Sequence, residues 1–421
     1  MSRSSIIVIG AGITGITTAY ALLRQGHGVT VIDRLPYSAM ETSYANGGQL
    51  SASNAEVWNS WATIFKGLRW MLDAKAPLLV NPAPSFHKLS WMAEFVAAIR
   101  NHRANTIETT RLAIQARQIL FEIAEREHID FDLQKRGILH LYYDRESFAT
   151  AARGNELLRE GGLVRYPVTD QEIHVIEPTL QGRFHGGFFT PADATGDIRK
   201  FTRGLAEACI RKGGKFLANT TVTDIKTRNS RHLVRMVNTE TGEQMSPVTA
   251  DAMVICAGVA SRHFASMLGD RINIYPVKGY SITVALEDAG SRAAAPTVSL
   301  LDESAKIVTS RLGQDRLRIA GTAEFNGYNL DIRADRIKPL VRWSRRLFPA
   351  VSTATVTPWA GLRPMTPNMM PRVGRGSRPG IYYNTGHGHL GWTLSAATAA
   401  MVSQVIGQDL TVPQEVLALA S

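Results

Sequence analysis

The spacing of apolar and polar positions changes along the chain, and it is most regular near the N-terminus. An apolar run at residues 5–10 is long enough for a buried strand. Apolar residues then recur at helical spacing over residues 13–26, and a second apolar run covers residues 29–33. A strand, a helix and a strand in such close succession form a right-handed parallel unit. The pattern therefore predicts that the chain begins with an α/β domain.

Further along, the pattern predicts a long helical region and then a mixture of helices and strands. Residues 56–127 have mainly helical periodicity, broken by prolines. Beyond them we expect strands at residues 137–143, 221–228, 232–239, 248–256, 353–361 and 380–384, more strands across 272–322, and helices near residues 146–160, 197–213, 333–348 and 391–407. The sequence contains no internal repeat or long polar linker, so we expect domains that are interleaved along the chain.

The composition is that of an ordinary globular protein, with 44% hydrophobic and 20% charged residues among 421. The 47 lysines and arginines exceed the 36 acidic residues, which gives a net charge of +11. Such an excess suits a nucleic acid or an anionic membrane surface. The basic residues are dispersed, and no aromatic–basic module accompanies them, so we expect no nucleic-acid partner.

Two further features concern the cellular setting. The two cysteines, Cys209 and Cys256, are too few for a disulfide framework or a cysteine-rich metal site, and their scarcity suits a reducing cytoplasm. Residues 4–23 and 381–408 carry no Asp, Glu, Lys or Arg. Although both stretches are long enough to cross a bilayer, they are rich in Gly, Ser and Thr, so we expect no transmembrane helix.

A glycine motif connects the first expected strand to the first helix. In Gly10-Ala11-Gly12-Ile13-Thr14-Gly15, the first glycine permits a tight turn, the second lets a pyrophosphate approach the backbone, and the third lets the helix pack on the strand. Phosphates would then lie at the positive N-terminus of the helix. Asp33, 18 residues after Gly15, is placed to accept hydrogen bonds from a ribose. The motif predicts a dinucleotide site and leaves the choice between FAD and NAD open.

Five motifs then follow along the chain. They are ETSYANGGQL at residues 41–50, KAPLLV at 75–80, YPVKGYSIT at 275–283, WAGLRPMTP at 359–367 and NTGHGHLGWT at 384–393. In this order, and with the nucleotide-binding pattern upstream, they resemble the motifs of the FAD-dependent D-amino-acid dehydrogenases of the small-subunit type. That family belongs to the larger D-amino-acid oxidase and glycine oxidase superfamily. The resemblance covers nearly the whole chain, and its last two motifs are specific.

The resemblance implies a particular α/β fold. A FAD-binding Rossmann-like domain of the glutathione-reductase type would be interleaved with an α+β substrate domain built on a mostly antiparallel sheet. The expected boundaries are residues 1–87, 165–272 and 361–421 for the FAD-binding domain, and residues 88–164 and 273–360 for the substrate domain. The two uncharged stretches would then form the strand, loop and helix at each end of the FAD site.

The resemblance also assigns residues to FAD. The adenosine end would lie near Asp33 and Arg34, and the flavin ring would lie against the loops at residues 46–49 and 387–393. The implied cofactor-binding residues are Gly10, Ala11, Gly12, Ile13, Thr14, Gly15, Asp33, Arg34, Thr42, Ser43, Asn46, Gly47, Gly48, Gln49, Val222, Ala257, Gly258, Gly388, His389, Leu390, Gly391, Trp392 and Thr393. The second loop leads into an uncharged helix, whose positive end would stabilise a negatively charged reduced flavin. We expect no metal, because the two histidines of the HGH sequence have no acidic or cysteine partner nearby in sequence.

On the substrate side the resemblance implies a catalytic set of Arg363, Tyr280 and His387. Arg363 would pair with the substrate carboxylate, because a planar guanidinium can hold both of its oxygens. The spacing of Tyr275 and Tyr280 puts them on opposite faces of a strand, so at most one lines the site, and we favour Tyr280. His387 would contact the flavin. One position departs from the family, since Ala305 stands where relatives often carry a tyrosine.

These implications together predict a FAD-dependent dehydrogenase that oxidises a D-amino acid. Arg363 would hold the carboxylate while hydride passes from Cα to flavin N5, and water would convert the imino acid to a 2-oxo acid and ammonia. A side-chain base is not required if the amine is bound neutral. Within the class, the substrate could instead be cis-4-hydroxy-D-proline. A glycine- or sarcosine-type oxidase is the nearest different chemistry.

The resemblance also bears on partners and location. The electrons would pass to a quinone or another acceptor, and the chain could be one subunit of a multi-protein dehydrogenase. Residues 57–80 mix Trp, Phe, Leu and Met with Lys66, Arg69 and Lys75, a composition that can lie in a membrane interface. Since members of the family are respiratory enzymes, we expect a cytoplasmic protein held peripherally on the cytoplasmic face of the inner membrane. Alternatively, the segment only covers the FAD domain.

Overall fold

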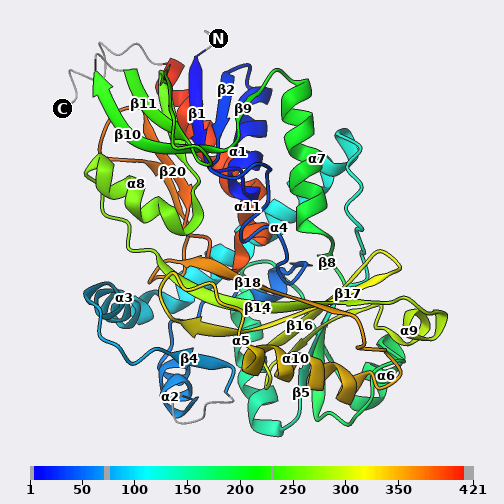
Figure 1. The fold of residues 1–421 in the computed structure, drawn as a ribbon. Coiled ribbons are helices and arrows are strands. Elements are labelled where there is room, and N and C mark those ends of the chain that lie inside the picture. The colour runs from blue at the N-terminus through cyan, green and yellow to red at the C-terminus, as the bar shows by residue number, and fades with distance from the viewer. Residues whose placement is uncertain (1–3, 71–75, 229–230, 412–421) are drawn as a thin grey trace.

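The computed structural model describes residues 4–70, 76–228 and 231–411. Figure 1 shows two parts stacked on each other, one built on a parallel sheet and the other on a broader sheet. The expected α/β class is confirmed, with a Rossmann-like part and a mostly antiparallel part. Within the described ranges, none of the helices is both long and apolar enough to cross a membrane.

The elements of the two parts alternate along the chain. The α-helices are α1 (Ile13–Arg24), α2 (Trp61–Trp70), α3 (Phe86–Ala97), α4 (His102–Arg126), α5 (Arg145–Glu160), α6 (Asp170–Ile176), α7 (Ile198–Arg211), α8 (Ser261–Leu268), α9 (Ala289–Ala294), α10 (Ala334–Leu347) and α11 (Gly391–Thr411). The strands are β1 (Ser5–Ile9), β2 (Gly28–Ile32), β3 (Gln49–Leu50), β4 (Leu78–Val80), β5 (Ile138–Tyr142), β6 (Tyr166–Val168), β7 (Gly186–Thr190), β8 (Ala194–Thr195), β9 (Lys215–Leu217), β10 (Thr220–Arg228), β11 (Arg231–Asn238), β12 (Gln244–Ala250), β13 (Ala252–Ile255), β14 (Tyr275–Ala285), β15 (Ser299–Asp302), β16 (Ile307–Leu312), β17 (Arg316–Phe325), β18 (Val356–Met365), β19 (Arg372–Arg375) and β20 (Ile381–Thr385). The short 3-10 turns are η1 (Ala52–Asn54), η2 (Ala98–Asn101), η3 (Gly258–Ala260) and η4 (Gly388–Leu390).

The six-stranded sheet has the order β19-β20-β13-β1-β2-β9 and is parallel except at β19. Its strand β1 is buried on both faces, which explains the continuous apolar run of the sequence. Ile6 and Val8 pack on one face against α1, α4, α7 and α11. Ile7 and Ile9 pack on the other face against α8 and the three-stranded sheet β10-β11-β12. A three-layer domain is therefore built around one short strand.

The nine-stranded sheet has the order β18-β14-β17-β16-β15-β5-β7-β6, with β4 added beside β17. Its pairs are antiparallel except β5 with β15 and β4 with β17. Helix α10 covers one face, where Leu340 and Trp343 join the core. The opposite face meets the six-stranded part, and there the Ser281 hydroxyl donates to Ala45 O over 2.7 Å. This second face is the one that can approach a bound dinucleotide.

Most expected elements are present with their ends shifted by a few residues, but the single strand expected at residues 248–256 is wrong. The run forms two strands in two different sheets, since β12 ends at Ala250 and β13 begins at Ala252. Asp251 separates them and accepts a hydrogen bond from Ser5 N over 2.7 Å. Strand β19 is absent from the expected elements, because its sequence RVGR has no apolar alternation.

The expected domain boundaries do not coincide with the division between the sheets. Strands β4, β6 and β7 fall in the ranges 1–87 and 165–272, which we assign to the FAD-binding domain, yet they pair within the nine-stranded sheet. Such short strands carry no pattern that says which sheet they join. The domain boundaries therefore stay a prediction.

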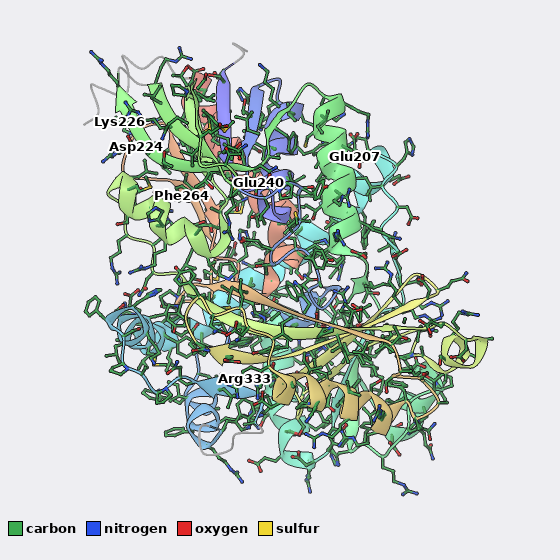
Figure 2. The ribbon with its side chains drawn as sticks, viewed as in Figure 1. Glu207, Asp224, Lys226, Glu240, Phe264 and Arg333 are labelled. Carbon is green, nitrogen blue, oxygen red and sulfur yellow. The ribbon has the colours of Figure 1, made fainter. Side chains whose placement is uncertain are left out.

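A buried ion pair lies within the nine-stranded sheet. Lys278 and Glu324 are almost fully buried, and Lys278 Nζ is 3.4 Å from Glu324 Oε1. The Tyr280 hydroxyl donates to Glu324 Oε2 over 2.8 Å, and Lys278 also donates to Asn329 Oδ1 over 2.7 Å. Arg333, labelled in Figure 2 where α10 begins, lies 4.0 Å from the same carboxylate. These contacts offset much of the cost of burying the two charges.

Replacing Glu324 by Leu should leave the Lys278 ammonium buried without its counter-charge. We expect the free energy of unfolding to fall by about 3–5 kcal/mol, because an uncompensated buried charge is strongly destabilising. Adding Lys278→Met to Glu324→Leu should recover most of that loss. Denaturation followed by circular dichroism measures both variants, and a double variant no more stable than the single one would contradict this account.

Candidate active site

The glycine motif forms the turn between β1 and α1, and the protein itself requires two of its glycines. Gly10 has φ of +107°, and a Cβ there would meet Cys256 O at 2.6 Å. A Cβ on Gly15 would collide with Gly10 O. Gly12 differs, because a Cβ there would meet only the Ser43 hydroxyl, at 3.5 Å. The protein itself therefore does not require glycine at position 12. A pyrophosphate that approaches this backbone from outside the chain does require it.

Two polar side chains hold the turn in place. Asp33 Oδ2 accepts from Ala11 N over 2.6 Å, and Asp33 Oδ1 accepts from Leu35 N over 2.8 Å. Burial raises the pKa of Asp33, although these two N–H groups oppose the rise. Ser43 Oγ accepts from Ile13 N over 3.1 Å. Because each carboxylate oxygen has a second lone pair, Asp33 can still accept from ribose hydroxyls.

A cavity of about 1980 Å³ runs from the glycine motif to the face of the nine-stranded sheet that carries Arg363. Of the implied cofactor residues, all except Gly15 line it, and Arg363, Tyr280 and His387 contribute to its wall. Its volume exceeds what a small ligand needs and suits a dinucleotide with a small substrate beyond it. The structure therefore brings both ends of the expected site into one space.

Two helix N-termini open onto this cavity. Helix α1 has Gly12 at its N-cap, without a side-chain cap and without an acidic residue in its first turn. Helix α11 follows η4 and also has no acidic residue in its first turn. Both ends are positive, so the first suits a pyrophosphate and the second suits the flavin edge that becomes negative on reduction. The residues present therefore fit FAD.

The loop that precedes β3 is fixed against the nine-stranded sheet. Arg318 Nη1 donates to Asn46 O over 3.0 Å, and Ser310 Oγ donates to Gly47 O over 2.7 Å. A Cβ on Gly47 would meet the Val308 side chain at 2.7 Å. The loop is thus held between the sheet and the cavity, where its backbone can reach a flavin ring.

Other implied cofactor residues use their side chains within the protein. Thr42 donates to a main-chain oxygen of β18 over 2.8 Å, and Gln49 donates to a hydroxyl of β15 over 2.8 Å. Arg34 forms an ion pair with Glu41 at the surface. The polar ends of these residues thus have partners within the protein, and their contacts with FAD stay a prediction.

The turn before α11 holds two neutral histidines. His387 Nε2 is 2.9 Å from Thr398 Oγ1, so its ring points into α11, and burial lowers its pKa to about 3. His389 stacks on Trp58 with ring centroids 4.6 Å apart and donates from Nε2 to Asn54 O over 3.3 Å. Burial lowers the pKa of His389 to about 4. The ring position gives no support to the catalytic role that we predict for His387.

Arg363 on β18 extends across the neighbouring strand, and its guanidinium covers Gly279. A Cβ on Gly279 would collide with three guanidinium atoms. Arg363 Nη1 donates to Thr322 O over 3.0 Å, and no carboxylate of the described ranges contributes to its charge state. Burial lowers the pKa of Arg363 to about 10, so it is still a cation at neutral pH. A half-buried cation on a cavity wall, with no carboxylate partner in the described ranges, is suited to receive a carboxylate.

A bulge in β17 presents the carbonyl that Arg363 uses. The pairing of β14 with β17 shifts register between Lys278 and Tyr280. Thr322 has φ of +64°, which is rare for a β-branched residue and costs of the order of 1–3 kcal/mol. The strained backbone turns Thr322 O toward the guanidinium. The sequence does not indicate this residue, because a bulge of this kind leaves no side-chain signature.

The two tyrosines of β14 lie on opposite faces of the nine-stranded sheet. Opposite residues in an antiparallel pair share a face, and Val277 is opposite Arg363. Tyr275, two positions earlier, therefore lies on the Arg363 face. Tyr280 lies on the other face and donates to Glu324. The place of Tyr280 on the substrate side stays a prediction without support from this geometry.

A polar group on the cavity wall is missing from the sequence-based site. His140 of β5 is buried, with Nε2 3.0 Å from Ser53 Oγ and Nδ1 3.3 Å from Glu303 Oε1. Lys306 forms an ion pair with the same Glu303. Ala305, the departure from the family, lies in the same turn and packs against the core of the sheet. The one feature of the sequence that could have indicated this site is the histidine within the otherwise apolar strand ILHLY.

The two-sheet fold and the cavity suited to FAD define a FAD-dependent oxidoreductase. The chain belongs to the FAD dependent oxidoreductase family, whose model matches residues 5–405. It is 61% identical over 407 residues to D-amino acid dehydrogenase 3 of Mesorhizobium japonicum, and the alignment covers 97% of this chain and 98% of the relative. It is 40% identical over 408 residues to the D-amino acid dehydrogenase of Dechloromonas aromatica, with 95% and 96% covered. The expected family and the expected FAD cofactor are confirmed.

Solved structures support the fold. Glycine oxidase from Bacillus cereus ATCC 14579 is similar with a TM-score of 0.74 and 20% identity over 96% of this chain and 95% of that one. L-proline dehydrogenase from P. horikoshii is similar with a TM-score of 0.74 and 18% identity over 97% and 94%. At these identities the likeness concerns the fold alone, and it confirms the expected combination of a Rossmann-like part with a mostly antiparallel part.

Gly12→Ala and Gly15→Ala should separate FAD binding from folding. A methyl group on residue 12 has room within the protein but occupies the approach of a pyrophosphate, so we expect FAD content to fall with the melting temperature of the apoprotein unchanged. A methyl group on residue 15 collides with Gly10 O, so both properties should fall. Flavin absorbance and thermal unfolding measure the two effects, and normal FAD content in Gly12→Ala would contradict the placement of the pyrophosphate.

Proposed function

We propose that this chain oxidises a D-amino acid to an imino acid, which water converts to a 2-oxo acid and ammonia. The observation that carries the proposal is Arg363, a half-buried cation without a carboxylate partner in the described ranges, at the end of the FAD cavity. The relatives at 61% and 40% identity are named D-amino acid dehydrogenases, which supports the D configuration and the dehydrogenase activity.

The side chains have definite tasks in this reaction, for which bound FAD would supply the hydride acceptor. Arg363 would hold both carboxylate oxygens and so fix the position of Cα. Thr322 O holds one N–H of the guanidinium, and Gly279 leaves room for it to lie flat on the sheet. His387 and His389 are neutral at neutral pH, so neither would repel a substrate ammonium group.

Arg363→Ala should lower kcat/KM by at least about two orders of magnitude, because roughly 3 kcal/mol of charged hydrogen bonding is lost. The measurement is anaerobic bleaching of the flavin absorbance by a panel of D- and L-amino acids. D-amino acids should bleach the wild-type protein, and the corresponding L-amino acids should not.

The matched control is Arg345→Ala, which removes an exposed arginine of α10 that donates to Thr353. It should bleach at the wild-type rate. Near-normal kinetics in Arg363→Ala would end the assignment of the carboxylate site, and bleaching by no amino acid would end the proposed function.

Helices α2 and α3 expose aromatic and basic side chains beside the cavity, and this surface bears on the electron acceptor. Helix α2 contributes to the cavity wall and exposes Trp61 (55%) and Phe65 (65%) beside the basic residues Lys66 and Arg69. Helix α3 exposes Phe86 (85%). Figure 1 shows both helices on the same side of the molecule. Exposed aromatic and basic side chains in this arrangement suit an anionic lipid interface.

We infer that α2 and α3 rest on the cytoplasmic face of the inner membrane, so that a quinone in the bilayer can reach the cavity. The support is the exposed aromatic surface beside the cavity, together with the net charge of +11. Residues 71–75, including Lys75, lie outside the described residues, so the inference rests on the two helices alone. A protein electron carrier that binds the same surface is the alternative outcome of the test.

The triple variant Trp61→Ser, Phe65→Ser and Phe86→Ser should bind membranes more weakly. We expect at least about tenfold less cosedimentation with vesicles that contain phosphatidylglycerol, because each aromatic side chain loses apolar area that it would bury in lipid. Val175→Ser removes an equally exposed apolar side chain from α6 and should bind as the wild type does. Equal cosedimentation of the triple variant and the wild type would rule out this surface.

A further inference from the structure

A series of hydrogen-bonded side chains leads through the wall of the cavity. Ser51 Oγ lies 3.0 Å from Ser53 Oγ, and Ser53 Oγ lies 3.0 Å from His140 Nε2. His140 Nδ1 lies 3.3 Å from Glu303 Oε1, and Glu303 Oε2 is paired with Lys306. All five residues line the same cavity as Arg363. We call Ser51, Ser53, His140 and Glu303 the polar relay.

The chemistry of the groups fixes the direction of the hydrogen bonds. Burial alone would raise the pKa of Glu303, but the Lys306 ammonium and the bond with His140 lower it well below its ordinary range. An ionised carboxylate only accepts, so His140 carries its proton on Nδ1 and accepts at Nε2 from the Ser53 hydroxyl. Because the Ser53 hydroxyl already donates its proton to His140, it accepts the proton of the Ser51 hydroxyl. Each group in the relay therefore points its proton toward Glu303.

Neither His140 nor Glu303 retains an extra proton at neutral pH. Burial lowers the pKa of His140 to about 4, helped by the nearby charges of Arg165 and Lys306. The pKa of Glu303 is lowered as well. A proton that reaches this pair therefore passes on to solvent, which is available because the Glu303 and Lys306 side chains are partly exposed.

The middle of the relay is held rigidly. Asp193, which is fully buried, accepts from Ala52 N and from Ser53 N, each over 3.0 Å. Arg117 donates to the same carboxylate. The η1 turn that carries Ser53 is thus fixed at two consecutive N–H groups, which fixes the backbone position from which the Ser53 hydroxyl reaches His140.

The inner end of the relay lies beside the expected flavin site. Ser51 N is 3.4 Å from Thr393 Oγ1, and Thr393 Oγ1 is 3.5 Å from Gln49 O. Thr393 lies in the first turn of α11, and Gln49 belongs to the loop that would lie against the ring. The relay therefore connects the reacting end of the cavity to its solvent-facing edge.

We propose that the polar relay carries the proton released by the substrate amino group from the flavin-facing side of the cavity to the solvent-accessible Glu303. The proposal rests on the proposed function. An amino acid that enters as its ammonium form breaks one N–H bond, and nitrogen keeps the electron pair. That pair forms the C=N bond while the hydrogen on Cα leaves with its own electron pair, for which bound FAD would be the acceptor. The proton enters at Ser51 Oγ, each hydroxyl and the imidazole pass on the proton they already hold, and Glu303 releases one to water.

Serine, histidine and glutamate also occur together in serine hydrolases, where the serine acts as a nucleophile. Such chemistry needs N–H donors near the nucleophile to stabilise an oxyanion. The N–H groups of Ala52 and Ser53 are both occupied by Asp193. The geometry therefore suits proton transfer and does not suit acyl transfer.

Two variants interrupt the relay in different ways. Ser53→Ala removes one hydroxyl, whereas His140→Gln keeps a donor and an acceptor but cannot pass a proton as an imidazole does. We expect both to slow anaerobic flavin reduction at saturating D-amino acid by at least about tenfold. The solvent deuterium isotope effect on that rate should rise, while the substrate dissociation constant and the FAD content stay unchanged.

The matched control is Thr190→Val, which removes a buried hydroxyl of β7 that has no hydrogen-bond partner within the described ranges. It should reduce flavin at the wild-type rate with the wild-type isotope effect. Wild-type rates in both relay variants, or slower rates without a change in isotope effect, would overturn the relay alone. If one relay variant does not fold, the other decides. If no D-amino acid bleaches the wild-type flavin, the proposed function falls and the relay falls with it.

Discussion

The partly desolvated charge of Arg363 imposes conditions that the surrounding sheet meets. Its side chain can cross β14 because residue 279 is glycine, and the opposite residue Gly361 leaves space for the Trp359 ring. Thr322 adopts a strained backbone and supplies a carbonyl to one side of the guanidinium. The cost of removing this cation from water is thus already present in the folded protein. A carboxylate that binds Arg363 offsets part of that cost. Because the pair also fixes the position of the carboxylate, the binding energy serves to orient the reacting Cα.

The same sheet also positions the loop that faces the flavin. Ser281, Ser310 and Arg318 donate to the oxygens of Ala45, Gly47 and Asn46 respectively. All three bonds end on main-chain atoms, so the path of the loop follows the curvature of β14, β16 and β17. The carboxylate receptor and the flavin loop are therefore held by a single rigid body. Their separation does not depend on a hinge between the two parts of the molecule.

The FAD end of the site was accessible from sequence because its geometry is local. A glycine motif, one helix and one acidic residue lie within a single strand–helix–strand unit, so their spacing in sequence predicts their arrangement in space. The substrate end depends on pairing between distant strands. Which face Tyr280 occupies is decided by the register of β14 against β18, and the contact of His140 with Glu303 joins residues 163 positions apart. The spacing of residues along the chain does not predict these contacts between distant strands. It does not predict the bulge at Thr322 either.

The position of β1 within the six-stranded sheet has a consequence for how the protein is made. One neighbour, β2, follows at once, but the other is β13, where Ile6 pairs with Ala252, 246 positions later. Strand β20, which pairs with β13, emerges later still. Until then the ribosome-bound chain carries an open sheet edge with uncovered apolar faces, and such edges are sites of aggregation. The sheet of the nucleotide half cannot be completed before Thr385 has been synthesised, so its early strands stay unpaired for longer than their own length would suggest.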